Sequence, residues 1–265
     1  MTQTRLFAFD LDDTLAHSKQ PMAAEMAEAL RRLLASTEVL IISGARFEQF
    51  ELQVLSMLPG VACLERLHLM PTCGTRYLRF QDGQWVQQYS HDLPQQLKNR
   101  VHELIEIESK RLGLWHQDDE IWGERIEDRG SQVTYSALGQ AAPVGAKRAW
   151  DVDGRKRETL RAALAQALPE LEVRAGGLTS IDITERGIDK AYGVNRLIEI
   201  LGLAPQEIEF VGDRLEPGGN DFPVVALGVL THAVRDCDET LDYLLELLPA
   251  IESRAAAGTL NGFRV

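Results

Sequence analysis

In the stretch Phe7-Ala8-Phe9-Asp10-Leu11-Asp12-Asp13-Thr14-Leu15, an apolar run ends in three carboxylates, and this feature indicates the architecture of the whole chain. The run Leu6–Phe9 is typical of a buried strand, so Asp10 and Asp12 are expected where that strand leaves the core. In open α/β sheets, ligands bind at the carboxyl ends of the strands. Hard oxygens gathered there suit Mg²⁺, and Mg²⁺ in turn suits phosphate. The motif therefore favours a phosphoryl-transfer site over a solvated turn.

The size and composition of the chain are those of a globular protein. Its 265 residues, 45% hydrophobic and 26% charged, suffice for one large domain or two modest ones. The net charge of -12 opposes a general role in binding nucleic acid, because phosphate backbones need basic surface. The chain has no apolar run as long as a membrane span and no signal-peptide layout, so we expect a cytoplasmic protein without a membrane partner. Three scattered cysteines fit neither a disulfide framework nor a thiolate metal site.

Strand and helix signals alternate near both ends of the chain. The predicted strands are 5–10, 38–42, 208–211 and 224–227, and the predicted helices are 22–34, 46–55, 190–200 and 239–248. Strands separated by helical patterns imply parallel pairing, so we expect an α/β core.

The middle of the chain has a different pattern. Helices are predicted at 93–112 and 154–167, and short strands at 124–128, 132–136, 171–174 and 178–183. These strands resemble an antiparallel sheet with helices on one face. We therefore expect residues 1–83 and 188–265 to form the core, and residues 84–187 to form an inserted α+β module. The tail, residues 255–265, has weak periodicity and is expected to be mobile.

Asp10 is the candidate nucleophile, because a carboxylate can accept a phosphoryl group as an acyl phosphate and so divide one difficult transfer into two easier ones. Asp12 is placed to give a proton to the leaving oxygen and later to take one from the attacking group. The same residues also begin like a calcium-binding EF-hand loop. That loop needs Gly at its sixth position and Glu at its twelfth, where this chain has Leu15 and Pro21, so calcium binding is disfavoured.

A hydroxyl and a lysine are the next candidates. Ser43 and Gly44 follow the apolar run 39–42 and precede a helix whose N-terminal amides favour an anion, although Ser-Gly there is also an ordinary turn and cap. Lys190 opens a helix and could neutralise both Asp10 and an incoming phosphate. The alternative for this lysine is a solvated surface position.

A glycine-containing acidic loop follows the predicted strand 208–211. In it, Asp213 is a candidate Mg²⁺ ligand, and Asp221 with Asn220 is expected to hold metal-bound water or to fix Lys190. The alternative is an ordinary acidic loop.

The order of these signals, with an inserted module between the second and the third, resembles the haloacid dehalogenase superfamily of phosphotransferases, and the place of the insertion is similar to that of the large caps in its Cof-type subfamily. The resemblance covers essentially the whole chain. It implies a Rossmann-like parallel-sheet core, a cap that closes over the substrate, Mg²⁺, and an aspartyl-phosphate on Asp10. The implied metal-binding residues are Asp10, Asp12, Asp213 and Asp221.

Three stretches resemble the eukaryotic-type phosphomannomutases within that superfamily. They are Arg125–Gly130, Gly176–Ile183 with the following 187–190, and Gly212–Asp221. The two resemblances and the position of Gly44 indicate the substrate-binding residues. These are Lys19, Gly44, Arg129, Lys147, Ser180 and Asp182. Arg129 would grip a distal phosphate, and Ser180 and Asp182 would contact sugar hydroxyls or phosphate.

This chain departs from the phosphomannomutase pattern where that family concentrates arginine. Lys19, Gln140 and Lys147 stand at such positions, and lysine offers phosphate a point charge where arginine offers a fork. This weakens the case for a mutase, which must hold a sugar by its far phosphate.

We therefore expect a Mg²⁺-dependent phosphatase that acts on a small phosphorylated metabolite, with a sugar phosphate favoured. Phosphomannomutase activity through the same intermediate is the close alternative. A non-catalytic phosphate sensor is a third hypothesis, against which the intact carboxylate pair argues. Because related caps can pair, a homodimer is compatible with the sequence.

Overall fold

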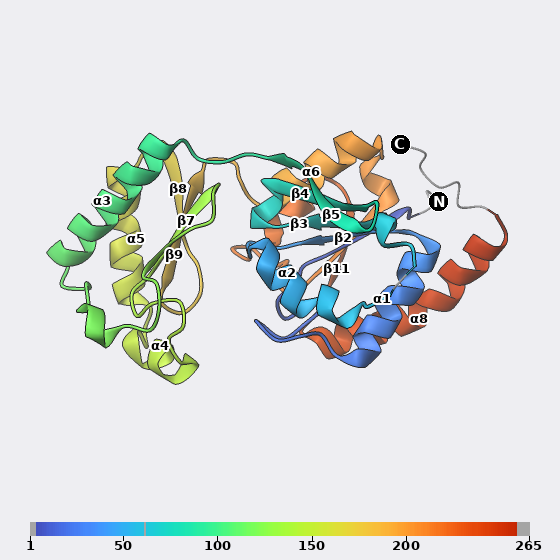
Figure 1. Ribbon diagram of the computed structural model, residues 1–265, viewed down its shortest axis with the longest axis horizontal. Coiled ribbons are helices and arrows are strands. Elements are labelled where there is room, and N and C mark those ends of the chain that lie inside the picture. Colours follow the sequence, from blue (N-terminus) through green and yellow to red (C-terminus); the bar gives the residue numbers. More distant parts are fainter. Residues whose placement is uncertain (1–3, 61, 259–265) are drawn as a thin grey trace. The chain divides into compact units, whose positions relative to one another are not determined.

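The computed structural model describes residues 4–60 and 62–258, which form two compact units (Figure 1). The first unit takes in the described chain up to Ser90 and from Ile188 onward, and the second is His91–Gly187. A mixed α/β fold with a mostly parallel central sheet confirms the predicted fold class.

The first unit is built on a seven-stranded sheet with the order β11-β10-β1-β2-β3-β4-β5. Its strands are β1 (Leu6–Phe9), β2 (Glu38–Ile42), β3 (Leu67–Met70), β4 (Arg76–Gln81), β5 (Gln84–Ser90), β10 (Ile208–Gly212) and β11 (Leu230–Ala233). The five strands from β11 to β3 are parallel, whereas β4 and β5 are antiparallel to their neighbours.

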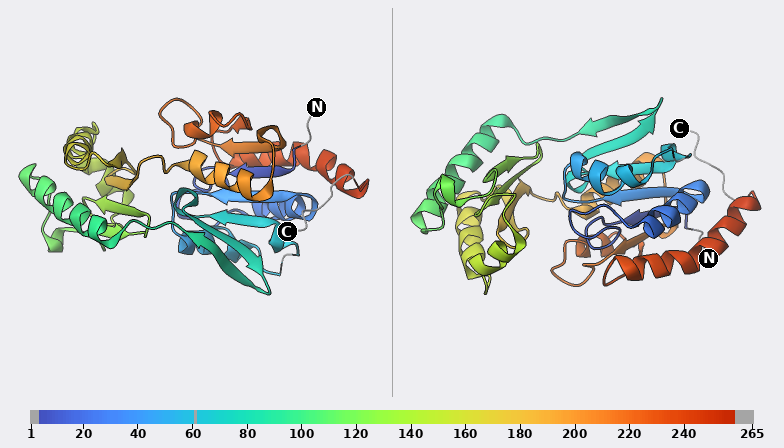
Figure 2. Two further views of the ribbon diagram at one scale, coloured as in Figure 1. Left: turned by 90° about the horizontal axis from the view of Figure 1, so that it is seen from above. Right: turned by 60° about the horizontal axis from the view of Figure 1, so that its bottom comes forward.

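Helices cover both faces of this sheet (Figure 2). They are α1 (Ala24–Ser36), α2 (Phe47–Gln53), α6 (Lys190–Leu201), α7 (Phe222–Val225) and α8 (Cys237–Ala256). In β1, Phe7 and Phe9 pack in one apolar core with residues of α1, α2 and α8, whereas Leu6 and Ala8 pack in another with residues of α6. Because both faces are buried, the strand is a continuous apolar run, and polar residues can begin only where it ends.

The second unit is an antiparallel sheet backed by helices. The sheet has the order β6 (Ile126–Asp128), β7 (Gln132–Ser136), β9 (Ser180–Glu185), β8 (Leu171–Ala175), and the helices are α3 (Gln95–Arg111), α4 (Val144–Trp150) and α5 (Arg155–Ala167). Alternate strand residues such as Val133, Tyr135 and Ile181 pack in a core with residues of α3 and α5. The residues between them, which include Glu127, Thr134 and Asp182, are paired in a row across three strands and make the other face polar.

Two sequence predictions differ from the structure. Residues 224–227, predicted as a strand, lie in and after the short helix α7, and the strand that follows is β11. The inserted unit begins at His91 rather than at residue 84, because residues 84–90 form β5 and pair with β4 in the sheet of the first unit.

Other features were not predicted or lie outside the described residues. The strands β3 and β4 and the helix α4 were not predicted, and α8 runs on to Ala256. Residues 259–265 of the predicted mobile tail are outside the described chain.

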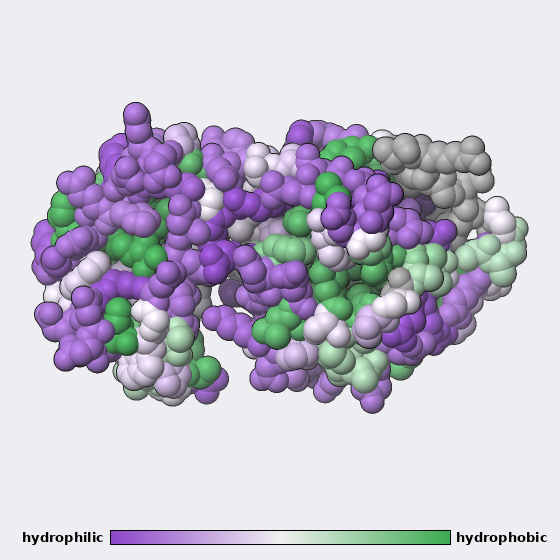
Figure 3. Space-filling view, in the orientation of Figure 1, coloured by the Kyte–Doolittle hydropathy of each residue, from purple (hydrophilic) through white to green (hydrophobic). Residues whose placement is uncertain are grey.

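The visible face of each unit is mostly hydrophilic, with smaller apolar areas between (Figure 3). Among the described residues, no helix combines the length and the apolar character that crossing a membrane requires.

Candidate active site

Three polar segments meet at one edge of the parallel sheet. β1 lies between β10 and β2, with Phe9 opposite both Val211 and Ile41, so the residues that follow these strands become neighbours. The segments are tied together by the bond from the Asp10 amide to the Val211 carbonyl, 3.0 Å, and by the bond from the Asp213 amide to Thr14 Oγ1, 3.1 Å. Asp10 and Asp213 are thus brought to the same sheet edge by strand pairing.

Lys190 lies in the middle of this edge. Its Nζ is 2.5 Å from Asp10 Oδ1 and 2.5 Å from Asp221 Oδ1, and all three side chains are buried. Burial by itself lowers the pKa of Lys190, but the two carboxylates outweigh burial and raise it, so the lysine stays charged. The structure thereby places Lys190 at the site and not on the surface.

Asp10, Asp213 and Asp221 form a cluster in which one carboxylate oxygen of each residue lies within 4.8 Å of the others. Burial raises the pKa of Asp10 to about 7, against the lowering effect of Lys190, and the Asp221 charge adds to burial. Burial and the Asp221 charge also raise the pKa of Asp213. Three carboxylates beside one lysine leave an excess of negative charge, and hard oxygens in such a setting fit a divalent cation such as Mg²⁺.

The Asp12 carboxylate is held elsewhere. It accepts hydrogen bonds from Gln49 Nε2 at 3.2 and 3.1 Å, from Gln53 Nε2 at 3.2 Å and from the Lys19 amide at 3.2 Å. Its oxygens are not in the cluster of Asp10, Asp213 and Asp221. A role for its carboxylate as a metal ligand is therefore not supported by this geometry.

The other residues of the first unit that are candidates for binding substrate also have defined positions. Ser43 is buried, and its Oγ accepts a bond of 3.1 Å from the Ala45 amide at the approach to α2. Gly44 is half-buried, whereas Lys19 is exposed and meets Asp12 through its backbone.

Gly212 is required by the close approach of Asp221. A Cβ at this position would overlap Asp221 Oδ2 and press on the ring of Phe210. The second oxygen of Asp221 is further held by the Arg214 amide at 3.2 Å. A glycine at the end of β10 therefore allows Asp221 to fold back toward Lys190.

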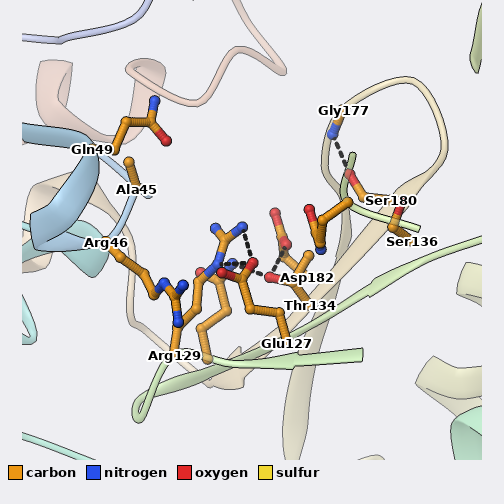
Figure 4. A network of polar contacts seen from close by, with 12 residues as sticks. Ala45, Arg46, Gln49, Glu127, Arg129, Thr134, Ser136, Gly177, Ser180 and Asp182 are labelled. Carbon is orange, nitrogen blue, oxygen red and sulfur yellow. Dashed lines mark hydrogen bonds and ion pairs between the residues drawn. The ribbon is translucent and has the colours of Figure 1, made fainter. Parts of the chain in front are cut away.

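In the second unit, Arg129 and Asp182 belong to one network of polar contacts on the polar face of the sheet (Figure 4). Arg129 donates from Nε and Nη2 to the same oxygen of Glu127, at 2.9 and 2.7 Å, and Thr134 Oγ1 donates to Asp182 at 2.7 Å. Burial raises the pKa of Asp182, against the effect of Arg129. Glu127 is therefore an ion-pair partner of Arg129 within this network.

The two remaining candidates of this unit are placed separately. Ser180 Oγ accepts a bond of 2.7 Å from the Gly177 amide, and Lys147 Nζ donates to the Gln140 carbonyl at 3.0 Å. A hydroxyl can donate as well as accept, and an ammonium has three donors, so both groups have the chemistry to bind a polar ligand.

Sequence reasoning missed Gln49, Gln53 and Glu127. The two glutamines are a helical turn apart on α2, a spacing that puts them on one face, but no sequence pattern says that this face meets Asp12. Glu127 lies in β6 two residues before Arg129, which directly follows that strand, and this spacing could have indicated the ion pair.

Comparison with known proteins gives a consistent result. Residues 7–226 match the family of haloacid dehalogenase-like hydrolases. The chain is 25% identical over 258 residues to phosphomannomutase 1 of Mus musculus, covering 91% of each chain. It is 30% identical over 131 residues to phosphomannomutase of Saccharomyces cerevisiae, covering 47% of this chain and 50% of that one.

Among solved structures, the fold is similar to that of the ATP-bound IMP-nucleotidase of Plasmodium falciparum, with a TM-score of 0.71 at 17% identity over 93% of this chain and 60% of that one. It is also similar to that of a haloacid dehalogenase-like hydrolase from Bacteroides thetaiotaomicron, with a TM-score of 0.63 at 16% identity over 95% and 99% of the two chains.

Proposed function

The chain belongs to the haloacid dehalogenase-like hydrolases, and on that basis we propose that it is a Mg²⁺-dependent phosphatase of a small phosphorylated metabolite, with a sugar monophosphate as the favoured substrate. The observation that carries the proposal is the buried Asp10–Lys190–Asp221 arrangement at the carboxyl edge of the sheet, with Asp213 beside it. A cation next to a buried carboxylate allows that carboxylate to approach an anionic phosphate.

The proposed reaction has two steps. In the first, a carboxylate oxygen of Asp10 bonds to phosphorus, the bond to the leaving oxygen breaks, and Asp12 gives its proton to that oxygen. In the second, water attacks the phosphorus, Asp12 takes a proton from it, and the bond to Asp10 breaks to release inorganic phosphate. Lys190 and the Ser43 loop bind the phosphoryl oxygens throughout.

The metal would be held by Asp10, Asp213 and Asp221, the three carboxylates that lie together. When bound, Mg²⁺ would neutralise charge on the transferring phosphoryl group and help to align it for in-line attack.

We propose that the second unit acts as a cap that recognises the leaving group through Arg129, Lys147, Ser180 and Asp182, with Lys19 and Gly44 contributing from the first unit. Because Glu127 pairs with Arg129 through two of its donors, a second phosphate at this guanidinium would meet the repulsion of the Glu127 carboxylate. This supports a phosphatase over a mutase, which must bind a second phosphate.

Phosphomannomutase activity is the second candidate, favoured by the similarity to mouse phosphomannomutase 1 over 91% of the chain. The two activities share the first step and differ in whether water or a sugar receives the phosphoryl group.

The test is phosphate release from p-nitrophenyl phosphate and from a panel of sugar phosphates, with and without Mg²⁺, and with Asp10→Asn as the inactive control. Mannose 1-phosphate with a catalytic amount of a hexose bisphosphate separates the candidates. Release of phosphate supports the phosphatase, whereas isomerised product without release supports the mutase. No turnover under any condition would contradict both.

A further inference from the structure

We propose that Gln49 and Gln53 of α2 are positioning residues for Asp12, which fix its carboxylate at the place where it exchanges protons with the reacting oxygens. This inference rests on the proposed function, because it needs Asp12 to act as the general acid and base.

The first observation is the set of donors around Asp12. Gln49 Nε2 meets both carboxylate oxygens, at 3.2 and 3.1 Å, while Gln53 Nε2 meets Oδ1 at 3.2 Å. The Lys19 amide also meets Oδ1, at 3.2 Å. All of these donors are amides, which contribute direction and no full charge. Donors that reach both oxygens from one helix restrict rotation of the carboxylate and set its plane.

The second observation is the position of Gln53. Its side chain is fully buried, Nε2 also donates to the His17 carbonyl at 3.3 Å, and among the described residues its Oε1 has no hydrogen-bond partner. A buried acceptor without a partner costs about 1–3 kcal/mol, a cost that an apolar side chain of similar size would avoid. The Gln53 amide therefore contributes to the site through its hydrogen bonds to Asp12 and to the His17 carbonyl in the segment that follows β1.

The third observation is where α2 lies in the chain. It follows the Ser43 loop, and the Gln53 carbonyl accepts a bond of 2.9 Å from the Met22 amide. The helix thus joins the loop after β2, which carries one candidate phosphate ligand, to the segment after β1, which carries Asp12. A general base oriented by a third group is a recurring feature of acid–base catalysis.

If the two glutamines position Asp12, the effect of replacing them on the rate of enzyme phosphorylation should depend on the leaving group of the substrate. Phenyl phosphate and p-nitrophenyl phosphate have nearly the same shape, but only the first has a leaving oxygen that needs a proton. Misplacing Asp12 should therefore slow phosphorylation of the enzyme by phenyl phosphate far more than by p-nitrophenyl phosphate. General acid catalysis contributes about 10²–10⁴-fold, so we expect a loss of about 10–100-fold for phenyl phosphate and of no more than about 3-fold for p-nitrophenyl phosphate.

The experiment measures formation of the phosphoenzyme by rapid quench with both aryl phosphates, for the wild type, Gln53→Leu and Gln49→Leu. Glu51→Gln is the control, since Glu51 is an exposed residue on the same helix. Having two separate variants guards against a folding defect in one, and thermal unfolding reports on the fold of each.

Unequal slowing in the glutamine variants, with the control unchanged, supports the proposal. Equal slowing with both substrates, or no slowing, overturns it while leaving the proposed function intact. If the wild type forms no phosphoenzyme with either substrate, the proposed function fails and this inference fails with it. A double-mutant cycle adds a second criterion: in an Asp12→Ala background, Gln53→Leu should have no further effect, and additive losses would contradict a role through Asp12.

Discussion

Replacing Lys190 by methionine tests how the site is held together. The change keeps an unbranched side chain of similar length but leaves Asp10 and Asp221 without the buried cation that lies 2.5 Å from each of them. Removing one partner of a buried ion pair costs about 3–5 kcal/mol, because the remaining charge stays buried. For a unit of this size, each kcal/mol lowers the melting temperature by roughly 2–4 °C, so a fall of roughly 6–20 °C is expected at pH 8.

The effect should depend on pH in a definite direction. The pKa of Asp10 is about 7 in the folded protein, above its ordinary 3.8, so protonation of Asp10 favours folding. This favourable contribution is fully present below pH 3.8 and is lost as the pH rises through 7. At pH 5 Asp10 is protonated in the absence of metal, little charge is left unpaired on it, and the penalty of Lys190→Met is correspondingly smaller.

The assay is differential scanning calorimetry in EDTA at pH 5 and pH 8, with Lys110→Met as the control for loss of an exposed lysine. Lys110 pairs with Glu106 on the surface of α3, and its replacement should change the melting temperature little at either pH. An equal fall at both pH values for Lys190→Met, or no fall at pH 8, would refute the reasoning.

Three further outcomes are expected. In metal-free protein, adding Mg²⁺ should raise the melting temperature more at pH 8 than at pH 5, because protons compete for Asp10 at the lower pH; equal effects would speak against this site. Gly212→Ala should lower phosphatase turnover by about 10-fold or more and stability by about 1–3 kcal/mol, since its Cβ would displace Asp221, while Gly145→Ala, where a Cβ meets nothing within 4 Å, should do neither. Glu127→Gln should raise the turnover of a hexose bisphosphate relative to a monophosphate by about 10-fold, measured as the ratio of kcat/KM values, because the change removes a negative charge that repels a second phosphate at Arg129; an unchanged ratio would count against the role assigned to that ion pair.

The ends of the parallel strands could be predicted from sequence because of how such strands are buried. Strands packed on both faces are continuous apolar runs, so a polar residue directly after one, such as Asp10 or Ser43, indicates where the sheet edge lies. The pairing of Lys190 with Asp10 required the resemblance to a known family, since a lysine at a helix start is commonly solvated.

Two errors in the fold prediction have local physical causes. The apolar run 224–227 fits a short helix as well as a strand, and Pro223 occupies the first turn of α7, where proline favours a helix. The predicted boundary at residue 84 lies seven residues before His91, where the second unit begins, because the chain turns at Asp82-Gly83 and does not leave the first unit there. Both residues have positive φ, 49° and 81°, as in a tight hairpin turn, so β5 returns along β4 within the same sheet.

The environment of Asp12 could not have been predicted. Gln49 and Gln53 lie 37 and 41 residues away in the chain, and their approach depends on how α2 packs against the segment that follows β1. Local patterns of charge and hydropathy contain no information about that packing. The same is true of the Asp213 amide, which finds Thr14 across 199 residues.

The most direct test of the account is to find where the phosphoryl group is attached during turnover. Protein quenched in acid after brief exposure to p-nitrophenyl phosphate and Mg²⁺ would be digested and its peptides analysed by mass spectrometry. We predict a single acid-stable, base-labile phosphoryl group on Asp10, absent from Asp10→Asn. A phosphoryl group on another residue, or undiminished turnover by Asp10→Asn, would contradict the account.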